Sequence, residues 1–277
     1  MRCIEIKLKE EGYPVEGGTL DGILADKMFD FNEPFIRPAV IVVPGGGYEF
    51  VSVREGEPVA SFFLARGYQV FVLRYLISKD GVSYPEQLIE LASAVDYVKK
   101  HAAEFNVNKE EVFAVGFSAG GHLTGNLAVD WQNVSQKAGF ALDCKPTAVG
   151  LSYPVITSKT HAHFGSYRNL LQDYTQEAKE ELQKQLNLDE QVSSQTPPTF
   201  LWTTAKDTVV PSQNALLFAL ALANNGIDYE LHVYPEGDHG AATCDFEINA
   251  HNAFLRKNAE WMEHCASFFR LYTKEQY

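Results

Sequence analysis

Short runs of apolar and often β-branched residues recur along this chain, and longer stretches of helical character separate them. Each run is bounded by glycine, proline or charged residues, a pattern typical of strands that are buried on both faces of a sheet. The predicted strands of this kind are residues 39–43, 69–73, 112–115, 148–151, 199–203 and 229–234. Because strands that alternate with helices form right-handed βαβ units, the pattern predicts an α/β fold with a mostly parallel sheet and helices on both faces.

The clearest predicted helix follows Ser83 and Pro85, where apolar residues recur at spacings of three and four. The apolar set of this helix is Leu88, Leu91, Val95, Val98 and Ala102. Near the start of the chain, Ile4, Ile6 and Leu8 alternate with charged residues, which indicates a strand and not the apolar core of a signal peptide. Through about residue 30 the chain is therefore expected to add antiparallel strands to the sheet.

One interval breaks the alternation of strands and helices. More than forty residues separate the fourth and fifth predicted strands, whereas a connection of this type usually has about two to six. Within the interval, residues 175–188 are rich in Glu, Gln, Lys and Leu and should form a helix. Ligands of open α/β sheets bind beyond the carboxyl ends of the strands. We therefore favour residues 155–197 as a cap over a site within a single domain of residues 1–277, with mere decoration of the fold as the alternative.

Composition excludes several kinds of partner and cofactor. With 23 Lys and Arg against 36 Asp and Glu, the net charge is −13, and so acidic a surface repels nucleic-acid phosphates and anionic lipids. The longest apolar run, residues 215–223, is far shorter than the roughly eighteen residues that a membrane span needs. The cysteines form no CxxC pair, which predicts a reducing, cytoplasmic location and neither a disulfide scaffold nor a zinc site. They are Cys3, Cys144, Cys244 and Cys265.

A Gly-x-Ser-x-Gly motif at residues 116–120 lies directly after a predicted strand and directly before a helical stretch. A serine hydroxyl is a poor nucleophile unless it is held exposed and next to a base, and a sharp strand-to-helix turn holds it in this way. The helix N-terminus also favours negative charge as it develops during reaction. The context predicts Ser118 as a nucleophile; the alternative is an idle serine in a glycine-rich turn.

Three consecutive glycines, Gly45–Gly47, follow the predicted strand at residues 39–43. Glycines let backbone N–H groups approach an oxyanion with no side chain in the way. Phosphate binding is the rival interpretation of a glycine-rich loop, but neither the GxGxxG spacing nor a following GK[ST] is present. An oxyanion-binding loop is therefore the favoured interpretation.

A nucleophilic serine needs a general base, and the base needs an orienting carboxylate. His239 lies in a glycine-flanked loop directly after the last predicted strand, at the sheet end where Ser118 is expected. Asp207 follows the preceding strand at the same end, with a capping or turn aspartate as the alternative. Asp238 competes for the role of the acid, but its adjacency to His239 hinders access to Nδ1 of that ring. Other histidines are expected on the helix after the serine (His122), in the insertion (His161, His163), in a strand (His232) and in the C-terminal helical stretch (His251, His264).

Four segments, PGGGY, GFSAGGH, TPPTFLWTTAKDTVVP and ELHVYPEGDHG, together resemble the α/β-hydrolase esterases of the acetyl esterase and acetyl-xylan esterase kind, which are relatives of the hormone-sensitive-lipase group. The resemblance runs from about residue 38 to about residue 264. It implies an α/β-hydrolase fold with Ser118 as nucleophile, Asp207 as acid and His239 as base. It also implies an oxyanion hole from the N–H groups of Gly46 or Gly47 and of Ala119, and no metal or organic cofactor.

The chain departs from the related lipases in two ways. Pro44 stands where they carry histidine before the glycines, which leaves the donor glycine open. Only some forty residues precede the glycine loop, so their long N-terminal cap is not expected here, and acyl binding is expected to rely on the insertion and on aromatic residues of the loops. Tyr48 and Tyr153 are the candidate substrate-binding residues, and Phe50, Tyr84, Phe164 and Tyr167 are further aromatics expected near the mouth, with core packing as the alternative for each of the six.

These observations predict a serine esterase that hydrolyses short-chain acetyl esters, such as those of acetylated xylo-oligosaccharides, through an acyl-enzyme. An amide hydrolase of the arylformamidase or small-peptidase type would use the same triad. A non-catalytic binding protein on the same scaffold is the third hypothesis. The expected partner is the small-molecule or oligosaccharide ester substrate, with a homo-oligomer left open.

Overall fold

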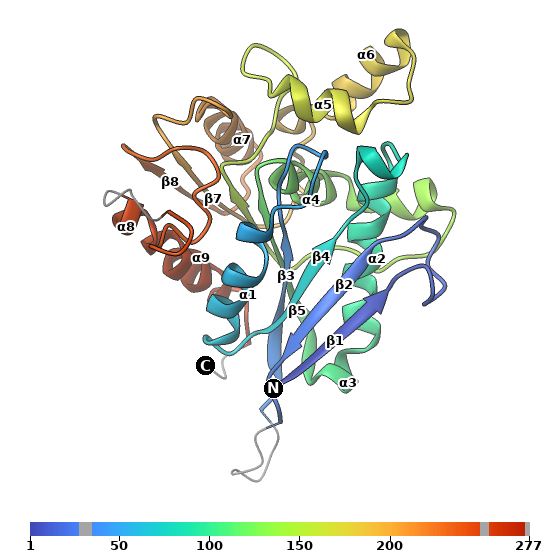
Figure 1. Ribbon diagram of the computed structural model, residues 1–277, viewed down its shortest axis with the longest axis vertical. Helices are drawn as coiled ribbons and strands as arrows, with labels where there is room; N and C mark the ends of the chain where they lie inside the picture. Colours follow the sequence, from blue (N-terminus) through green and yellow to red (C-terminus); the bar gives the residue numbers. More distant parts are fainter. Residues whose placement is uncertain (28–34, 250–254, 275–277) are drawn as a thin grey trace.

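An eight-stranded sheet forms the centre of the protein in a computed structural model that describes residues 1–27, 35–249 and 255–274 (Figure 1). The strand order is β1-β2-β4-β3-β5-β6-β7-β8. β2 pairs antiparallel with β1 and β4, and the other neighbours pair parallel. The strands are β1 (Arg2–Lys7), β2 (Thr19–Leu24), β3 (Arg37–Val43), β4 (Gln69–Arg74), β5 (Val107–Phe117), β6 (Val149–Ser152), β7 (Thr199–Thr204) and β8 (Tyr229–Tyr234).

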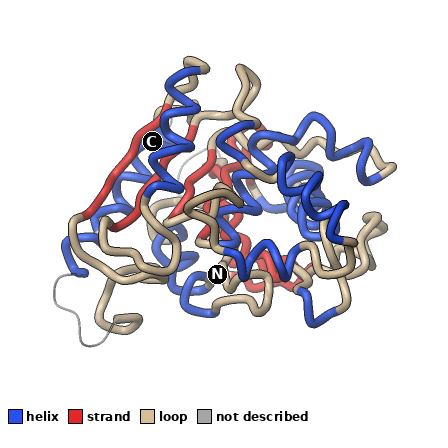
Figure 2. Tube along the Cα trace, turned by 90° about the horizontal axis from the view of Figure 1, so that it is seen from above, coloured by secondary structure: helices blue, strands red, loops and turns tan. Residues whose placement is uncertain are grey.

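Helices cover both faces of this sheet (Figure 2). One face packs against α1 (Glu57–Leu64) and α9 (Glu260–Arg270), and the other packs against α2 (Glu86–Lys100), α4 (Ala119–Ala138) and α7 (Gln213–Asn224). The remaining helices are α3 (Ala102–Phe105), α5 (Phe164–Leu170), α6 (Gln176–Gln185) and α8 (Leu255–Asn258), with 3-10 turns η1 (Val53–Glu55), η2 (Ser78–Asp80) and η3 (Leu188–Glu190). The predicted α/β fold class is confirmed.

β5 shows why the central strands read as continuous apolar runs. Phe113, Val115 and Phe117 belong to the core beneath α1 and α9, whereas Val112 and Ala114 face the helices of the opposite layer. Side chains of a strand alternate between the two faces, so a strand with a core on each side is apolar at every position. β5 is longer than predicted because its amino end, from Val107, carries polar residues that an apolar pattern does not detect.

The strand order reverses between β3 and β5, which lie side by side although β4 separates them in the sequence. In open α/β sheets a ligand site forms at such a switch point, beyond the carboxyl ends of the strands. The glycine loop follows β3 and Ser118 follows β5, so both meet at this edge. Residues 155–197, which include α5 and α6, lie above the same edge (Figure 1).

The helical predictions near this edge agree with the structure. The helix expected after Pro85 is α2, and Ala102 of its apolar set begins the short α3. Within residues 175–188, α6 starts after Thr175, whose hydroxyl accepts a hydrogen bond from the N–H group of Ala178. This is a standard N-terminal cap.

Candidate active site

Ser118 lies at a sharp turn between β5 and α4. Its backbone has φ 53° and ψ −116°, a conformation that a non-glycine residue adopts only when its surroundings enforce it. The turn needs close backbone contact, because a Cβ atom on Gly120 would collide with the carbonyl oxygens of Val43 and Pro44. The Gly-x-Ser-x-Gly spacing thus follows from the packing of the turn against the end of β3.

The loops after β7 and β8 bring an aspartate and a histidine to this serine. His239 Nε2 lies 2.8 Å from Ser118 Oγ, and His239 Nδ1 lies 2.6 Å from Asp207 Oδ2. A carboxylate only accepts hydrogen bonds, so the Nδ1–H group donates to Asp207 and Nε2 is left to accept from the serine hydroxyl. The structure therefore brings together Ser118, His239 and Asp207.

Asp207 also makes the turn contacts that were the alternative interpretation of this residue. Its Oδ1 accepts hydrogen bonds from the N–H groups of Val209 and Val210, each at 2.9 Å. These contacts fix the carboxylate so that its other oxygen faces the imidazole. Asp238, the competing acid, is exposed to solvent beside His239.

The loop that carries His239 is anchored to the protein core. The hydroxyl of Thr204 donates to the carbonyl of Gly237 at 2.7 Å, and the indole of Trp261 donates to the carbonyl of Ala242 at 2.9 Å. Both anchors are buried. Although His239 lies on a loop, rigid elements on each side hold its position.

The glycine loop after β3 presents its N–H groups through an unusual backbone. Gly46 and Gly47 have φ values of 125° and 65°, and a Cβ atom on Gly46 would collide with the carbonyl oxygen of Phe50. The carbonyl of Gly45 accepts from the Ser52 N–H group, and that of Gly46 accepts from Glu49 and Phe50. In a trans peptide the following N–H group points the opposite way to the carbonyl, so the N–H groups of Gly46 and Gly47 point away from these three donors.

The hydrogen bonds narrow the set of oxyanion donors. The N–H group of Gly45 donates to Glu55 Oε2 at 2.8 Å, and that of Ser118 donates to the Ser152 carbonyl at 3.0 Å. Ala119 is the first residue of α4, where N–H groups have no acceptor within the helix. Gly46, Gly47 and Ala119 therefore remain the candidate donors.

The structure corrects the expected substrate contacts of two tyrosines. Tyr48 and Tyr153 are 1% and 2% exposed, so neither ring offers a face to a substrate. Tyr84 and Tyr167 of the further aromatic set are buried as well. Phe50 and Phe164, in contrast, are 56% and 71% exposed.

His122 connects the glycine loop to the segment above it. Tyr48 donates its hydroxyl to His122 Nδ1 at 2.8 Å, and His122 Nε2 donates to the Leu186 carbonyl at 3.2 Å. Burial lowers the pKa of His122 to about 4, so the ring is uncharged at neutral pH. The expectation that His122 packs and forms hydrogen bonds is confirmed.

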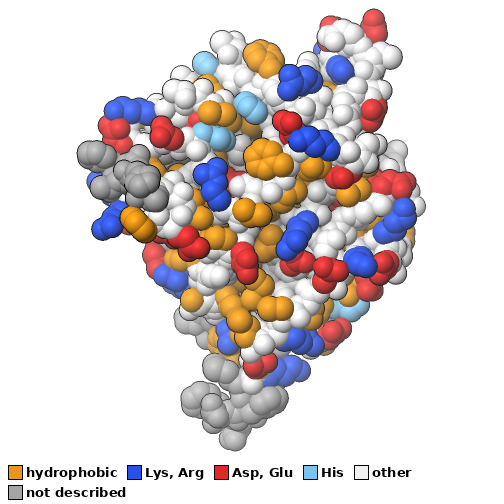
Figure 3. Space-filling model, in the orientation of Figure 1, with side chains coloured by type: hydrophobic (Ala, Val, Ile, Leu, Met, Phe, Trp, Pro, Cys, Tyr) orange, Lys and Arg blue, Asp and Glu red, His pale blue; other side chains and the backbone are white. Residues whose placement is uncertain are grey.

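Two residues, Asn169 on α5 and His163 directly before this helix, lie at the glycine loop. The sequence did not indicate either of them as a site residue. The Asn169 side chain donates to the Gly47 carbonyl at 2.8 Å. His163 Cε1 lies 3.8 Å from where a Gly47 Cβ atom would be, and burial, followed by the charge of His239, lowers the pKa of His163. Histidine side chains gather at this upper end of the molecule, beside exposed apolar side chains (Figure 3). No local motif marks either residue, because the glycine loop that both approach is distant in sequence.

One cluster away from this site offers metal-ligand atoms among the described residues. Glu230, His232 and His264 place such atoms within 4.8 Å of one another. The two imidazole rings stack at 4.5 Å and 15°, so their in-plane lone pairs lie side by side and do not converge on one ion. The cluster is on β8 and α9, away from Ser118. His251, the other histidine expected in the C-terminal helical stretch, lies outside the described residues.

A mostly parallel sheet whose carboxyl edge carries a serine on a strand-to-helix turn, followed in sequence by an aspartate and a histidine, defines the α/β-hydrolase fold. Within that fold the chain belongs to the BD-FAE family, whose model matches residues 31–222. None of the helices in the described ranges is long and apolar enough to cross a bilayer.

Three known proteins illustrate the similarity. Endo-1,4-beta-xylanase B of Butyrivibrio fibrisolvens is 35% identical over 86% of this chain and 37% of its own length. Acetylxylan esterase of Xylanibacter ruminicola is 28% identical over 81% of this chain and 45% of its own length. This chain thus spans less than half of either protein. A solved structure of an acetyl ester-xyloside bifunctional hydrolase from Caldicellulosiruptor lactoaceticus is 30% identical, with a TM-score of 0.81, over 98% of this chain and 96% of that one.

Proposed function

We propose that this protein is a serine esterase that hydrolyses short-chain esters, namely acetyl esters of carbohydrates. The observation that carries the proposal is the hydrogen-bonded series Ser118–His239–Asp207 at distances of 2.8 and 2.6 Å. In this arrangement the serine is the nucleophile, the histidine the general base and the aspartate the group that orients the histidine.

The reaction follows from this geometry. Ser118 Oγ bonds to the ester carbonyl carbon while its proton passes to His239 Nε2, and the carbonyl electron pair moves onto oxygen. The tetrahedral intermediate then breaks its bond to the alcohol, which leaves with the proton from His239. Water repeats the sequence on the acyl-enzyme, with its proton passing to His239, and releases the acid and the free serine.

Backbone N–H groups stabilise the oxyanion in both steps. Gly46 or Gly47 and Ala119 are the proposed donors, and each such donor is worth about 3 kcal/mol in the transition state. No metal or organic cofactor takes part in this scheme.

The substrate class rests on the named relatives and on the segment above the site. One of the proteins described above is named an acetylxylan esterase and another an acetyl ester-xyloside bifunctional hydrolase, which supports an acetylated xylo-oligosaccharide as the substrate. In this proposal residues 155–197 form a cap within a single domain, and the exposed ring of Phe164 on α5 contacts the sugar. The four free cysteines, three of them buried, support a reducing, cytoplasmic location.

A substrate panel tests the proposal. The purified protein is assayed with acetylated xylo-oligosaccharides, with p-nitrophenyl esters of increasing acyl length, and with formyl-amides and aminoacyl amides. We expect acetate release from the oligosaccharides, and a kcat/KM for p-nitrophenyl esters that peaks at acetate or propionate. A deep apolar pocket would gain about 0.8 kcal/mol for each buried CH₂ group, so kcat/KM would then rise with acyl length.

The outcomes separate the alternatives. A kcat/KM that rises through octanoate contradicts the acetyl-ester specificity but leaves the triad untouched. Faster turnover of formyl-amides or aminoacyl amides favours the amide hydrolase, which shares the same triad. No turnover of any substrate, together with an unreactive Ser118, favours the non-catalytic binding protein.

A further inference from the structure

Glu55, in η1, is a buried carboxylate next to the glycine loop. It is 3% exposed, and each of its two oxygens accepts a hydrogen bond. Oε2 accepts from the N–H group of Gly45 at 2.8 Å, and Oε1 accepts from the hydroxyl of Tyr153 at 2.7 Å. A Cβ atom on Gly45 would lie only 2.9 Å from Ser118 Cβ, so the carboxylate holds the part of the loop that packs against the serine.

Tyr153 extends this connection to the loop that carries His239. Its hydroxyl oxygen accepts from the N–H group of Ala242 at 3.0 Å, and its ring packs edge-on against His239 with the centroids 5.0 Å apart. Burial, followed by the charge of Glu55, raises the pKa of Tyr153 well above 10, so its hydroxyl keeps the proton that it donates. Tyr153 and Ala242 both have positive φ values, 36° and 48°, which a non-glycine residue adopts only under constraint.

We propose that Glu55 is a positioning residue that joins the oxyanion loop to the His239 loop through Tyr153, and so sets the spacing of oxyanion donors and general base around Ser118. This proposal rests on the proposed esterase function. Glu55 does not touch the reacting atoms; it acts on Gly45 directly and on Ala242 through the tyrosine. Sub-ångström placement of these groups matters, because electrostatic stabilisation of an oxyanion depends on donors held in advance at the right distance.

The direction of the hydrogen bonds explains why the residue must be a carboxylate. The Gly45 N–H group and the Tyr153 O–H group both donate toward Glu55, while Tyr153 itself accepts from Ala242. Only a carboxylate accepts on both of its oxygens. A glutamine keeps the size but turns one acceptor into a donor, so it faces either the Gly45 N–H group or the tyrosine hydroxyl with the wrong partner.

The test compares Glu55→Gln with a matched control, Glu111→Gln. Glu111 is 2% exposed and lies on β5; its Oε1 also accepts from a side chain, Asn108 at 2.7 Å, and from a backbone N–H group, that of Lys274 at 2.8 Å. Its partners lie at the amino end of β5, opposite to Ser118. Both substitutions disturb a buried carboxylate, but only Glu55→Gln disturbs the proposed connection.

Steady-state kinetics with p-nitrophenyl acetate, the rate of fluorophosphonate labelling of Ser118 and the Tm are measured for each variant. We expect Glu55→Gln to lower kcat and the labelling rate about tenfold to a hundredfold with KM within about twofold, since oxyanion stabilisation acts in the transition state. Glu111→Gln should lower Tm without lowering kcat. Tyr153→Phe should lower kcat less than Glu55→Gln, and the double variant should behave like Glu55→Gln alone, because both residues act in one series.

Each outcome decides the proposal. If Glu55→Gln keeps the wild-type kcat and loses only Tm, as Glu111→Gln does, Glu55 merely supports the fold and the proposal is wrong. If Glu55→Gln does not fold, Tyr153→Phe, which removes one hydroxyl, provides the same test, and a wild-type kcat then overturns the proposal. A wild-type protein that neither labels nor hydrolyses esters overturns the esterase function as well, whereas an active wild type with an unaffected Glu55→Gln overturns only the role of Glu55.

Discussion

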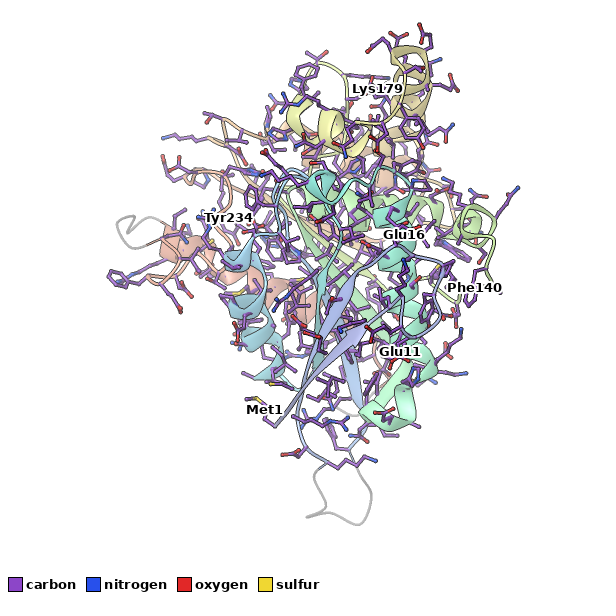
Figure 4. All side chains as sticks on the ribbon, turned by 45° about the vertical axis from the view of Figure 1, so that its right-hand side comes forward. Met1, Glu11, Glu16, Phe140, Lys179 and Tyr234 are labelled. Atoms are coloured by element: carbon purple, nitrogen blue, oxygen red, sulfur yellow. The ribbon has the colours of Figure 1, made fainter. Side chains whose placement is uncertain are left out.

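The strand-end loops and the segment above them border the same site but are built in different ways. Ser118 and Asp207 in the loops are each 6% exposed, and buried or partly buried hydrogen bonds fix them. In the segment above, α6 buries none of its residues Gln176–Gln185, and Lys179 on this helix lies at the end of the molecule opposite to Met1 (Figure 4). Phe164 on α5 is largely exposed.

This difference indicates that the loops position the reacting groups and that the segment above them contacts the substrate. Reacting groups must be held within fractions of an ångström, which a buried and constrained scaffold achieves. Exposed side chains on a separate segment can contact a substrate without disturbing that scaffold. Substitutions in the loops should therefore change kcat, and substitutions of exposed residues in the segment of residues 155–197 should change KM.

The largest expected effect is that of Ser118→Ala. Removing the nucleophile of a triad lowers kcat by about a millionfold, so we expect neither turnover nor labelling by an organofluorophosphonate. Mass spectrometry of the labelled wild type should find one adduct per chain, on Ser118. An adduct on another serine would contradict the assignment of the nucleophile.

The next largest effect should distinguish the two candidate acids. Asp207→Asn keeps the size of the side chain but presents the wrong hydrogen-bond partner to His239, and kcat should fall about ten-thousandfold. Asp238→Asn changes an exposed neighbour of the same histidine and should have little effect. If the two variants gave the opposite result, the acid would be Asp238.

The site residues that could be predicted from the sequence share one property. Ser118, Asp207 and His239 each follow a strand of the parallel part of the sheet, and parallel strands bring their carboxyl ends to one edge. Glu55 and Asn169 could not be found in this way. Their partners Tyr153 and Gly47 are 98 and 122 residues away in sequence, so only the folded chain brings them together.

The two tyrosines show the limit of reasoning from position alone. Tyr48 and Tyr153 do follow strands at the correct edge, as the sequence indicated. Their positive φ values, 59° and 36°, belong to turns whose packing directs the side chains into the core. A residue next to a motif can be placed near the site from the sequence, but the direction of its side chain depends on backbone angles that the pattern does not contain.

A moderate effect on substrate affinity is expected from Phe164→Ala. Loss of an apolar contact with a sugar, about 1 kcal/mol, should raise KM for an acetylated xylo-oligosaccharide roughly threefold to tenfold. The KM for p-nitrophenyl acetate and the Tm should not change. Leu271→Ala is the matched control, since Leu271 is 72% exposed and lies beyond α9, near the C-terminus. An equal change in kcat for both substrates would show that Phe164 supports the scaffold instead.

The smallest effect on activity at neutral pH is expected from substitution of His122, which contacts both regions through Tyr48 and Leu186 and whose contribution to the free energy of unfolding depends on pH. Its pKa is about 4 in the folded protein against an ordinary value of 6.5. The unfolded chain therefore binds a proton at higher pH than the folded one, and the free energy of unfolding falls as pH drops from 6.5 toward 4. At 1.36 kcal/mol for each unit, the loss is on the order of 3 kcal/mol.

Urea unfolding of the wild type and of His122→Gln between pH 8 and pH 4.5 measures this contribution. The difference in the free energy of unfolding between the two proteins should shrink as pH falls, because only the wild type loses the contribution of a neutral, buried imidazole. Tyr48→Phe, which leaves His122 buried, should retain most of the pH dependence. A difference that stays constant with pH would mean that His122 is not the group that titrates. In that case the contact between the glycine loop and residues 155–197 would not depend on an uncharged histidine.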